Sequence, residues 1–165
     1  MRSALLLLCV AALSGCLSRE SRHAEKLEGR YQLGDPGDGW RPVQPGGADF
    51  AFLNRDLGAT MYADSNCGSR FEDAPLPDMV KHQLFGVVDP KAAPLHEAWT
   101  TLDGREAYTT RRAGILDGVA VELGVTVLKK DTCVYDLVVI ASPGERFEQA
   151  WAGYQSMVQG FRTLP

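Results

Sequence analysis

The sequence has few of the residues from which common catalytic sites are built. It holds 3 His and 4 Cys in 165 residues, and neither a Cys-x-x-Cys pair nor His residues at metal-ligand spacing occur. A Gly-x-Ser-x-Gly nucleophile elbow and a glycine-rich phosphate loop are also missing. These absences argue against a zinc site, a dithiol oxidoreductase, a serine hydrolase and a nucleotide-binding enzyme. We therefore expect no catalytic residues, no metal and no cofactor.

The sequence also lacks an excess of positive charge. Lys and Arg number 17 against 21 Asp and Glu, which gives a net charge of −4 at pH 7. Basic residues occur singly or in pairs such as Arg111 and Arg112, with acids between them, so the chain has no basic stretch for phosphate backbones. We expect no binding to nucleic acid.

No hydrophobic run reaches the length of a membrane-spanning helix. The run Ala4–Leu13 has about ten residues, whereas a spanning helix needs roughly 20. The run follows the single positive charge of Arg2 and ends in Leu-Ser-Gly-Cys at Cys16. This arrangement is typical of a secretory signal, and its last four residues resemble a bacterial lipobox.

The resemblance to bacterial lipoproteins implies a signal peptide over residues 1–15 and lipidation of Cys16. In that family the Cys thiol carries a diacylglyceryl group and the new amino group carries a third acyl chain, such as palmitate. Three chains make the attachment effectively permanent, because each buried methylene contributes roughly 0.8 kcal/mol. Leu17 and Ser18 follow in place of Asp, which favours the outer membrane with the domain facing the periplasm. The alternatives are an uncleaved anchor or an ordinary secretory signal in which Cys16 is incidental.

The expected mature chain divides into a tether and one domain. Residues 16–28 are polar and charge-rich after the lipidated Cys, which predicts a flexible tether, with a short helix through Ala24 and Leu27 as the alternative. Residues 29–165 are long enough to bury about two thirds of their unfolded surface. A single domain of this size needs no metal or partner to fold.

Two cysteines remain in this domain, Cys67 and Cys133, because Cys9 leaves with the signal peptide. In an oxidising compartment such a pair usually forms a disulfide, so we predict a structural bridge. Closing so long a loop stabilises a protein by about 4 kcal/mol in the chain-entropy picture. A redox pair and half of a metal site are the alternatives.

The domain is predicted to be α+β, with about six strands in an antiparallel sheet. A first short strand around Tyr31 and Leu33 precedes a Gly/Pro-rich turn, and Asp-Gly pairs, a strong hairpin signal, separate later strand-like runs. The longer predicted strands are Asp49–Leu53, Ala59–Asp64, Leu95–Leu102, Arg105–Ala113, Val119–Leu128 and Cys133–Ala141, with a loop at Asp64–Pro77. The near-continuous apolar run after Cys133 indicates a central strand covered on both faces, so Asp136 needs a partner or lies at the edge of the cover.

Two helices are predicted beside this sheet. The first begins near Pro77 and Asp78 and runs to Leu84, with Gly86 as its stop. The second follows Pro143, and its apolar residues repeat at spacings of about 4 and 3, which places them on one face. These residues are Phe147, Trp151, Tyr154, Val158 and Phe161, and we expect them to pack on the sheet while Glu148, Gln155 and Arg162 face water. The alternative is a ligand wall or a partner surface.

Two groups of polar residues are weak candidates for a site. Asp64, Ser65 and Asn66 form the most polar cluster and have the residue types of a cation site, although such a run is more often an ordinary loop. The second group is three carboxylates that could line one face of the sheet, those of Glu97, Glu106 and Glu122. We expect this face to be an ordinary solvated surface.

The order of these elements resembles the PsbP-like α/β/α sandwich. The resemblance covers Gly29–Leu164 and includes the segment Leu102–Ala107 before a strand and the closing Val158–Phe161. That fold is shared by the photosystem PsbP protein, the Ran-binding Mog protein and many bacterial lipoproteins. The resemblance implies a fold and no catalytic residues, and the manganese and calcium roles of the photosystem protein have no matching residues here.

Two functions remain open at this stage. The first is a non-enzymatic interaction or accessory module of the cell envelope, in transport, assembly or motility, that is held to the membrane by lipid on Cys16. It would bind an envelope protein through a sheet edge or the loops near Cys67. The second is a small-ligand carrier or a hydrolase-like enzyme with a pocket between sheet and helix.

Overall fold

A computed structural model of the chain describes residues 30–44, 46–68 and 73–165. The predicted signal peptide, the lipidation site Cys16 and the tether lie outside the described residues. No helix in the described ranges is long and apolar enough to cross a membrane.

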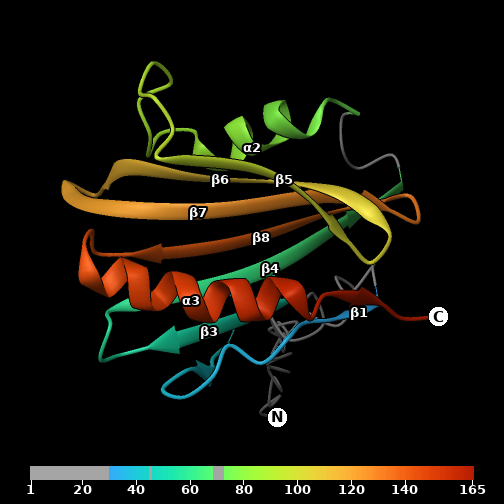
Figure 1. Cartoon of the computed structure of the whole chain (residues 1–165), viewed down its shortest axis with the longest axis horizontal. Helices are drawn as coiled ribbons and strands as arrows, with labels where there is room; N and C mark the ends of the chain where they lie inside the picture. Colours follow the sequence, from blue (N-terminus) through green and yellow to red (C-terminus); the bar gives the residue numbers. More distant parts are fainter. Residues whose placement is uncertain (1–29, 45, 69–72) are drawn as a thin grey trace, which may run out of the picture.

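A seven-stranded antiparallel sheet forms the middle layer of the domain, in the order β2-β3-β4-β8-β7-β6-β5 (Figure 1). Its strands are β2 (Arg41–Pro42), β3 (Phe50–Asn54), β4 (Ala59–Cys67), β5 (His96–Leu102), β6 (Arg105–Leu116), β7 (Val119–Lys130) and β8 (Cys133–Ala141). Two further short strands, β1 (Tyr31–Gln32) and β9 (Arg162–Thr163), pair with each other in a separate ribbon. The architecture is α+β, as predicted.

The predicted number of about six strands is too low. β2 has two residues and includes Pro42, so it offers no alternating pattern to detect. The loop predicted from Asp64 is also wrong at its start, because β4 continues to Cys67. Polar residues there look like a loop in sequence, yet they pair with β8 residue by residue, which supplies the backbone hydrogen bonds that a loop would lack.

Three tight turns connect the long strands of the second half of the chain. All turn residues have positive φ, a conformation in which Gly, Asp and Asn are favoured and whose twist matches that of paired strands. The turn residues are Asp103 and Gly104, Asp117 and Gly118, and Asp131 and Thr132. The predicted meander from β5 to β8 is confirmed.

The two helices cover opposite faces of the sheet (Figure 1). Helix α2 (Leu76–Leu84) packs on β6 and β7, and helix α3 (Glu145–Gln159) packs on β8, β4 and β7. The predicted stripe of α3, together with Phe161 just beyond its end, is buried, whereas Glu148 and Gln155 are exposed. The expectation that this stripe belongs to the core is confirmed.

Trp151 of α3 packs so closely on the sheet that the strand beneath it has no room for a side chain. A Cβ at Gly124 of β7 would lie 2.3 Å from the Trp151 ring and 2.8 Å from Val139. Beside it, the hydroxyl of Tyr154 donates to the carbonyl O of Leu137 at 2.8 Å and lies 2.7 Å from the hydroxyl of Thr126. These contacts fix where α3 lies on the sheet.

Candidate functional site

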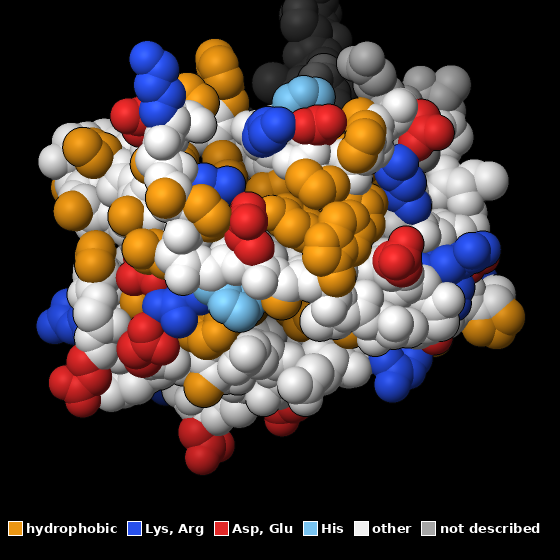
Figure 2. Space-filling model, turned by 45° about the horizontal axis from the view of Figure 1, so that its top comes forward, with side chains coloured by type: hydrophobic (Ala, Val, Ile, Leu, Met, Phe, Trp, Pro, Cys, Tyr) orange, Lys and Arg blue, Asp and Glu red, His pale blue; other side chains and the backbone are white. Residues whose placement is uncertain are grey.

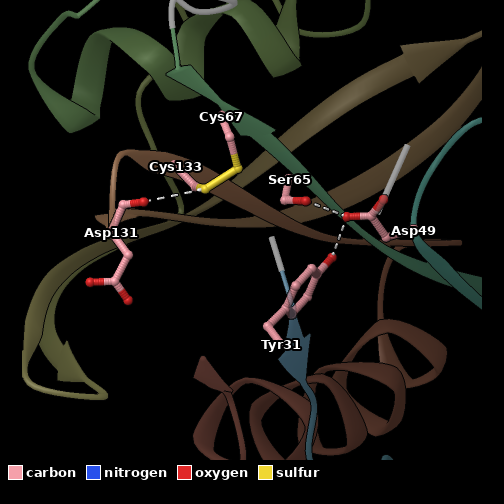
Figure 3. The surroundings of a disulfide bond; sticks show 6 residues. All are labelled: Tyr31, Asp49, Ser65, Cys67, Asp131 and Cys133. Atoms are coloured by element: carbon pink, nitrogen blue, oxygen red, sulfur yellow. Dashed lines mark hydrogen bonds between the residues drawn. A yellow bond between two sulfur atoms is a disulfide. The ribbon is translucent and has the colours of Figure 1, made fainter. Parts of the chain in front are cut away.

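The predicted cysteine pair joins the two central strands. Cys67 at the end of β4 lies opposite Cys133 at the start of β8, and the structure bonds them in a disulfide with a Cα–Cα distance of 4.0 Å (Figure 3). The sulfur of Cys133 also lies 3.6 Å from the carbonyl O of Asp131. Because Cys133 is buried, the bond belongs to the core and closes a separation of 66 residues.

A small polar network lies next to this disulfide. The side chains of Tyr31 and Ser65 both donate to Oδ2 of Asp49, at 3.0 and 2.6 Å (Figure 3). Burial raises the pKa of Tyr31 far above its ordinary value, and the negative charge of Asp49 raises it further. The network fastens β1 and β4 to the chain before β3. Ser65 is therefore a buried strand residue and not part of a cation-binding loop.

Asp136 is a carboxyl group in the middle of the sheet. It lies on the central strand β8 with 5% of its surface exposed, and Nε2 of Gln83 on α2 donates to its Oδ2 at 2.8 Å. Burial, and after it the charge of Asp64 directly across on β4, raise the pKa of Asp136 to about 7, while the bond from Gln83 acts in the opposite direction. The predicted need for a partner is confirmed, and that partner is Gln83.

The three carboxylates considered in the sequence do not converge. Glu122 bonds Arg111 at 2.5 Å on the face covered by α3, where Arg111 also bonds Glu148 at 2.6 Å. Glu97 of β5 accepts a hydrogen bond from the hydroxyl of Tyr108 on β6. Burial is the larger cause and this hydrogen bond the next, and together they raise the pKa of Tyr108 to about 12. Within residues 30–44, 46–68 and 73–165 no three His, Cys, Asp or Glu residues form a group that would hold a metal ion.

The arrangement best suited to binding is an apolar groove at one end of the sheet. It lies between the loop after α2 and the end of the β6–β7 hairpin, and its volume is about 990 Å³. Its apolar lining includes Leu84, Phe85, Val87, Val88, Pro90 and Ile115. Phe85 is 89% exposed and Ile115 is 61% exposed, while Val119 across the turn is 62% exposed. Figure 2, viewed from the side of α2, shows hydrophobic side chains at the surface of this face among scattered charged ones.

The groove has a defined wall because the loop after α2 is bonded to β6. The backbone N–H of Ile115 donates to the carbonyl O of Val87 at 2.8 Å, and those of Val87 and Val88 donate to Leu84. A Cβ at Gly114 would lie only 2.7 Å from the same oxygen of Val87. Gly114 therefore permits the loop to approach the strand, and the exposed Phe85 is held next to the hairpin.

Charged residues lie at the margin of the groove. Lys81 pairs with Asp78 at 2.5 Å on the surface of α2. Nη1 of Arg112 donates to the carbonyl O of Ala92 at 2.7 Å, and its other terminal nitrogen lies 3.5 Å from Glu97. The groove thus combines apolar residues with two cations that are each paired with a carboxylate, and its lining also includes Asp89 and Asp117.

Sequence reasoning missed this groove, although two signals were present. The segment Phe85–Val88 after α2 holds three large apolar residues in a connection for which the sequence predicted neither helix nor strand. Ile115, Leu116 and Val119 surround an Asp-Gly turn, where polar residues are usual at the surface. Only the folded chain places these two segments side by side.

No model of a known protein family matches the sequence, and no curated protein matches it. Solved structures do resemble the domain. LpqN of Mycobacterium tuberculosis, described as involved in cell envelope biogenesis, has a TM-score of 0.57 at 13% identity over 84% of this chain and 86% of its own. The cyanobacterial PsbP protein of Synechocystis has a TM-score of 0.52 at 13% identity over 82% of this chain and 94% of its own. A Bacteroides thetaiotaomicron protein has a TM-score of 0.54 at 8% identity, over 84% of this chain and 50% of its own.

These similarities establish the fold. The chain has the α+β architecture of the PsbP-like proteins, and the resemblance stated from the sequence is confirmed at that level.

Proposed function

We propose that the protein is a lipid-anchored accessory module of the bacterial envelope that binds an envelope protein through the apolar groove. Acyl chains on Cys16 hold the domain at the outer membrane, and residues 17–28 act as its tether. The exposed side chains of Phe85 and Ile115, which both line the groove, carry the proposal, because an apolar patch rimmed by polar groups marks an interaction site more often than a plain surface.

The position of the groove supports a partner on the aqueous side of the membrane. The described chain begins next to β9, where Arg30 accepts a backbone hydrogen bond from Leu164, and Thr163 of β9 bonds the β5–β6 turn at Asp103. The groove lies at the far end of β6, so the length of that strand, roughly 40 Å at 3.3 Å per residue, separates the two. A domain tethered at β1 presents the groove away from the bilayer.

The fold of LpqN adds limited support, because that envelope protein has the same architecture at 13% identity. The role that we propose is non-enzymatic. Glu97 and Glu106 lie on the α2 face of β5 and β6, whereas Glu122 bonds Arg111 on the α3 face, and the most perturbed carboxyl, Asp136, is enclosed beneath α2.

Site-specific photo-crosslinking in the intact envelope tests the proposal. A photoreactive residue replaces Ile115 in the groove or, as a matched control, Arg41 on the exposed edge strand β2. We expect one discrete envelope-protein adduct from position 115 and none from position 41. Phe85→Asp should abolish the adduct without changing the denaturation midpoint, because Phe85 is almost fully exposed. Equal adducts from both positions, or an adduct that Phe85→Asp leaves unchanged, would contradict the proposal.

A second candidate function is a carrier of a small amphipathic ligand in the same groove. The observation that favours it is that the groove places charged side chains, Lys81 and Arg112 among them, beside apolar ones, which suits an amphipathic ligand. Native mass spectrometry of the protein extracted from its membrane decides between the two. A bound small molecule that is lost in Ile115→Asp supports the carrier, and a ligand-free protein supports the interaction module.

A further inference from the structure

The two edges of the main sheet are very different. β2 has two residues, Arg41 and Pro42, and is thus short and carries a proline, two devices that prevent pairing with another strand. β5 at the other edge has seven residues, His96–Leu102, with neither proline nor lysine among them. β5 is therefore the edge that remains open to an added strand.

The hairpin geometry determines which backbone groups of β5 are open. Leu102 and Arg105 flank the two-residue turn at Asp103 and Gly104, so they form a hydrogen-bonded pair, and such pairs alternate along the hairpin. The residues between them, Glu97, Trp99 and Thr101, direct their backbone N–H and C=O groups away from β6. In the part of the chain that the structure describes, no strand lies on that side of β5.

The side chains of these three residues share one face of the sheet, the face on which α2 lies. Trp99 is 58% exposed and its ring packs against Tyr108 of β6, with 5.1 Å between ring centroids. An exposed Trp in the middle of an open edge strand is costly to leave in water, because a Trp side chain buries 150–250 Å² when it is covered.

We propose that β5 pairs antiparallel with β5 of a second copy of this chain, about a two-fold axis at Trp99. In this register Trp99 lies opposite its own counterpart and Glu97 lies opposite Thr101, so no like charges face each other. Each of these pairs would exchange both of its open backbone hydrogen bonds. The two main sheets then form one continuous sheet. Tyr108 and Trp99 of each copy form a row of four aromatic rings across the interface.

Two-fold axes at the other two outward-facing residues fit less well. A two-fold axis at Glu97 places two carboxylates directly opposite each other, which destabilises a strand pair. An axis at Thr101 places Trp99 opposite the turn residue Asp103 and leaves Glu97 unpaired. A surface that meets its own copy in this way is self-complementary, as a two-fold interface requires.

Disulfide trapping in the full chain tests both the pairing and its register. The double variant Glu97→Cys with Thr101→Cys places a Cys opposite a Cys across the axis, whereas either single variant places each Cys opposite a residue without a thiol. Upon mild oxidation in the envelope we expect a covalent dimer from the double variant and essentially none from the single variants. Adding Trp99→Lys should reduce the dimer at least tenfold, because it places two positive charges face to face.

Three results would overturn the inference. The first is a double variant that stays monomeric although both thiols react with a small maleimide. The second is equal dimer formation by the single variants, which would indicate random collision and not this register. The third is an adduct with a different protein, which would assign the edge to another partner.

The native Cys67–Cys133 bond does not compete in this experiment, because its sulfurs are already joined. The inference does not depend on the lipid anchor, so it stands or fails separately from the proposed function.

Discussion

At the scale of single residues, Asp136 is the most unusual group in the domain. It lies in the central strand among valines of the α2-side core, where an ionised carboxylate is poorly solvated. Its raised pKa, about 7, means that the folded state keeps the proton up to neutral pH, whereas the unfolded chain releases it near 3.8. Between these values the unfolded state binds fewer protons than the folded state, so stability decreases as pH rises through this window.

The variant Asp136→Asn should remove this pH dependence. The amide oxygen of Asn still accepts the bond from Gln83 and carries no charge at any pH. From pH 4 to pH 8 we expect the free energy of unfolding of the wild type to fall by about 2 to 4 kcal/mol relative to the variant, since one pKa unit equals about 1.4 kcal/mol. Denaturant titrations at several pH values measure this difference, with Asp56→Asn on an exposed turn as the control. Parallel curves for Asp136→Asn and the wild type would contradict the account.

At the scale of elements, α3 derives its position from one aromatic stripe. Its polar face contributes the Glu148 contact to Arg111, while Phe147, Trp151 and Tyr154 fill the core between helix and sheet. A helix of 15 residues is marginal in isolation, so its stability comes from this packing.

Trp151→Ala should therefore destabilise the domain by about 3 to 5 kcal/mol, the range for deleting a large buried aromatic side chain. Gln155→Ala on the exposed face of the same helix serves as the matched control and should have little effect. Denaturation midpoints of the two variants provide the comparison. An unchanged midpoint for Trp151→Ala, together with loss of a crosslinked partner, would mean that the stripe is an interface.

The disulfide between Cys67 of β4 and Cys133 of β8 also stabilises the arrangement of the elements. Replacing both Cys67 and Cys133 with Ala should lower the free energy of unfolding by about 4 kcal/mol, because the bridge closes a long loop in the unfolded chain. A reducing agent should lower the melting temperature of the wild type and leave that of the double variant unchanged. Two free thiols in the denatured, unreduced protein would show that the bond does not form.

Local patterns in the sequence predicted the elements that depend on short-range chemistry. Asp-Gly pairs located two of the three hairpins of the meander, and the spacing of Phe147, Trp151 and Tyr154 located α3 with its buried face. The sequence did not reveal β2, which pairs with β3, or the continuation of β4 through Asp64, because their strand character comes from pairing with distant residues. The groove was missed for the same reason, since Phe85 and Ile115 are brought together only by the tertiary fold.

At the scale of the whole molecule, the proposed function places a lipid anchor at one end of the domain and the apolar groove at the other. The seven-stranded sheet acts as a rigid spacer between β1 and the β6–β7 turn, and its central strands are held by both cores and by the disulfide. The proposed function requires both ends: without a lipid on Cys16 the domain would not be retained at the membrane, and without Phe85 and Ile115 the groove would lose its most exposed apolar side chains.

Cys16→Ser should separate these two properties. The variant lacks the thiol that accepts the diacylglyceryl group, so we expect it to leave the membrane fraction or to retain its signal peptide. The folded domain itself should keep its denaturation midpoint, because residue 16 lies outside the described fold. Fractionation with radiolabelled acyl chains measures both the location and the modification.

The mass of the mature N-terminus tests the proposed lipid anchor on Cys16. The protein is extracted from membranes with detergent and digested, and its N-terminal peptide is analysed by mass spectrometry. We expect a peptide that begins at Cys16 and carries a diacylglyceryl group and an additional acyl chain. A peptide that begins upstream of residue 16, or an unmodified Cys16 in the membrane-extracted protein, would contradict it.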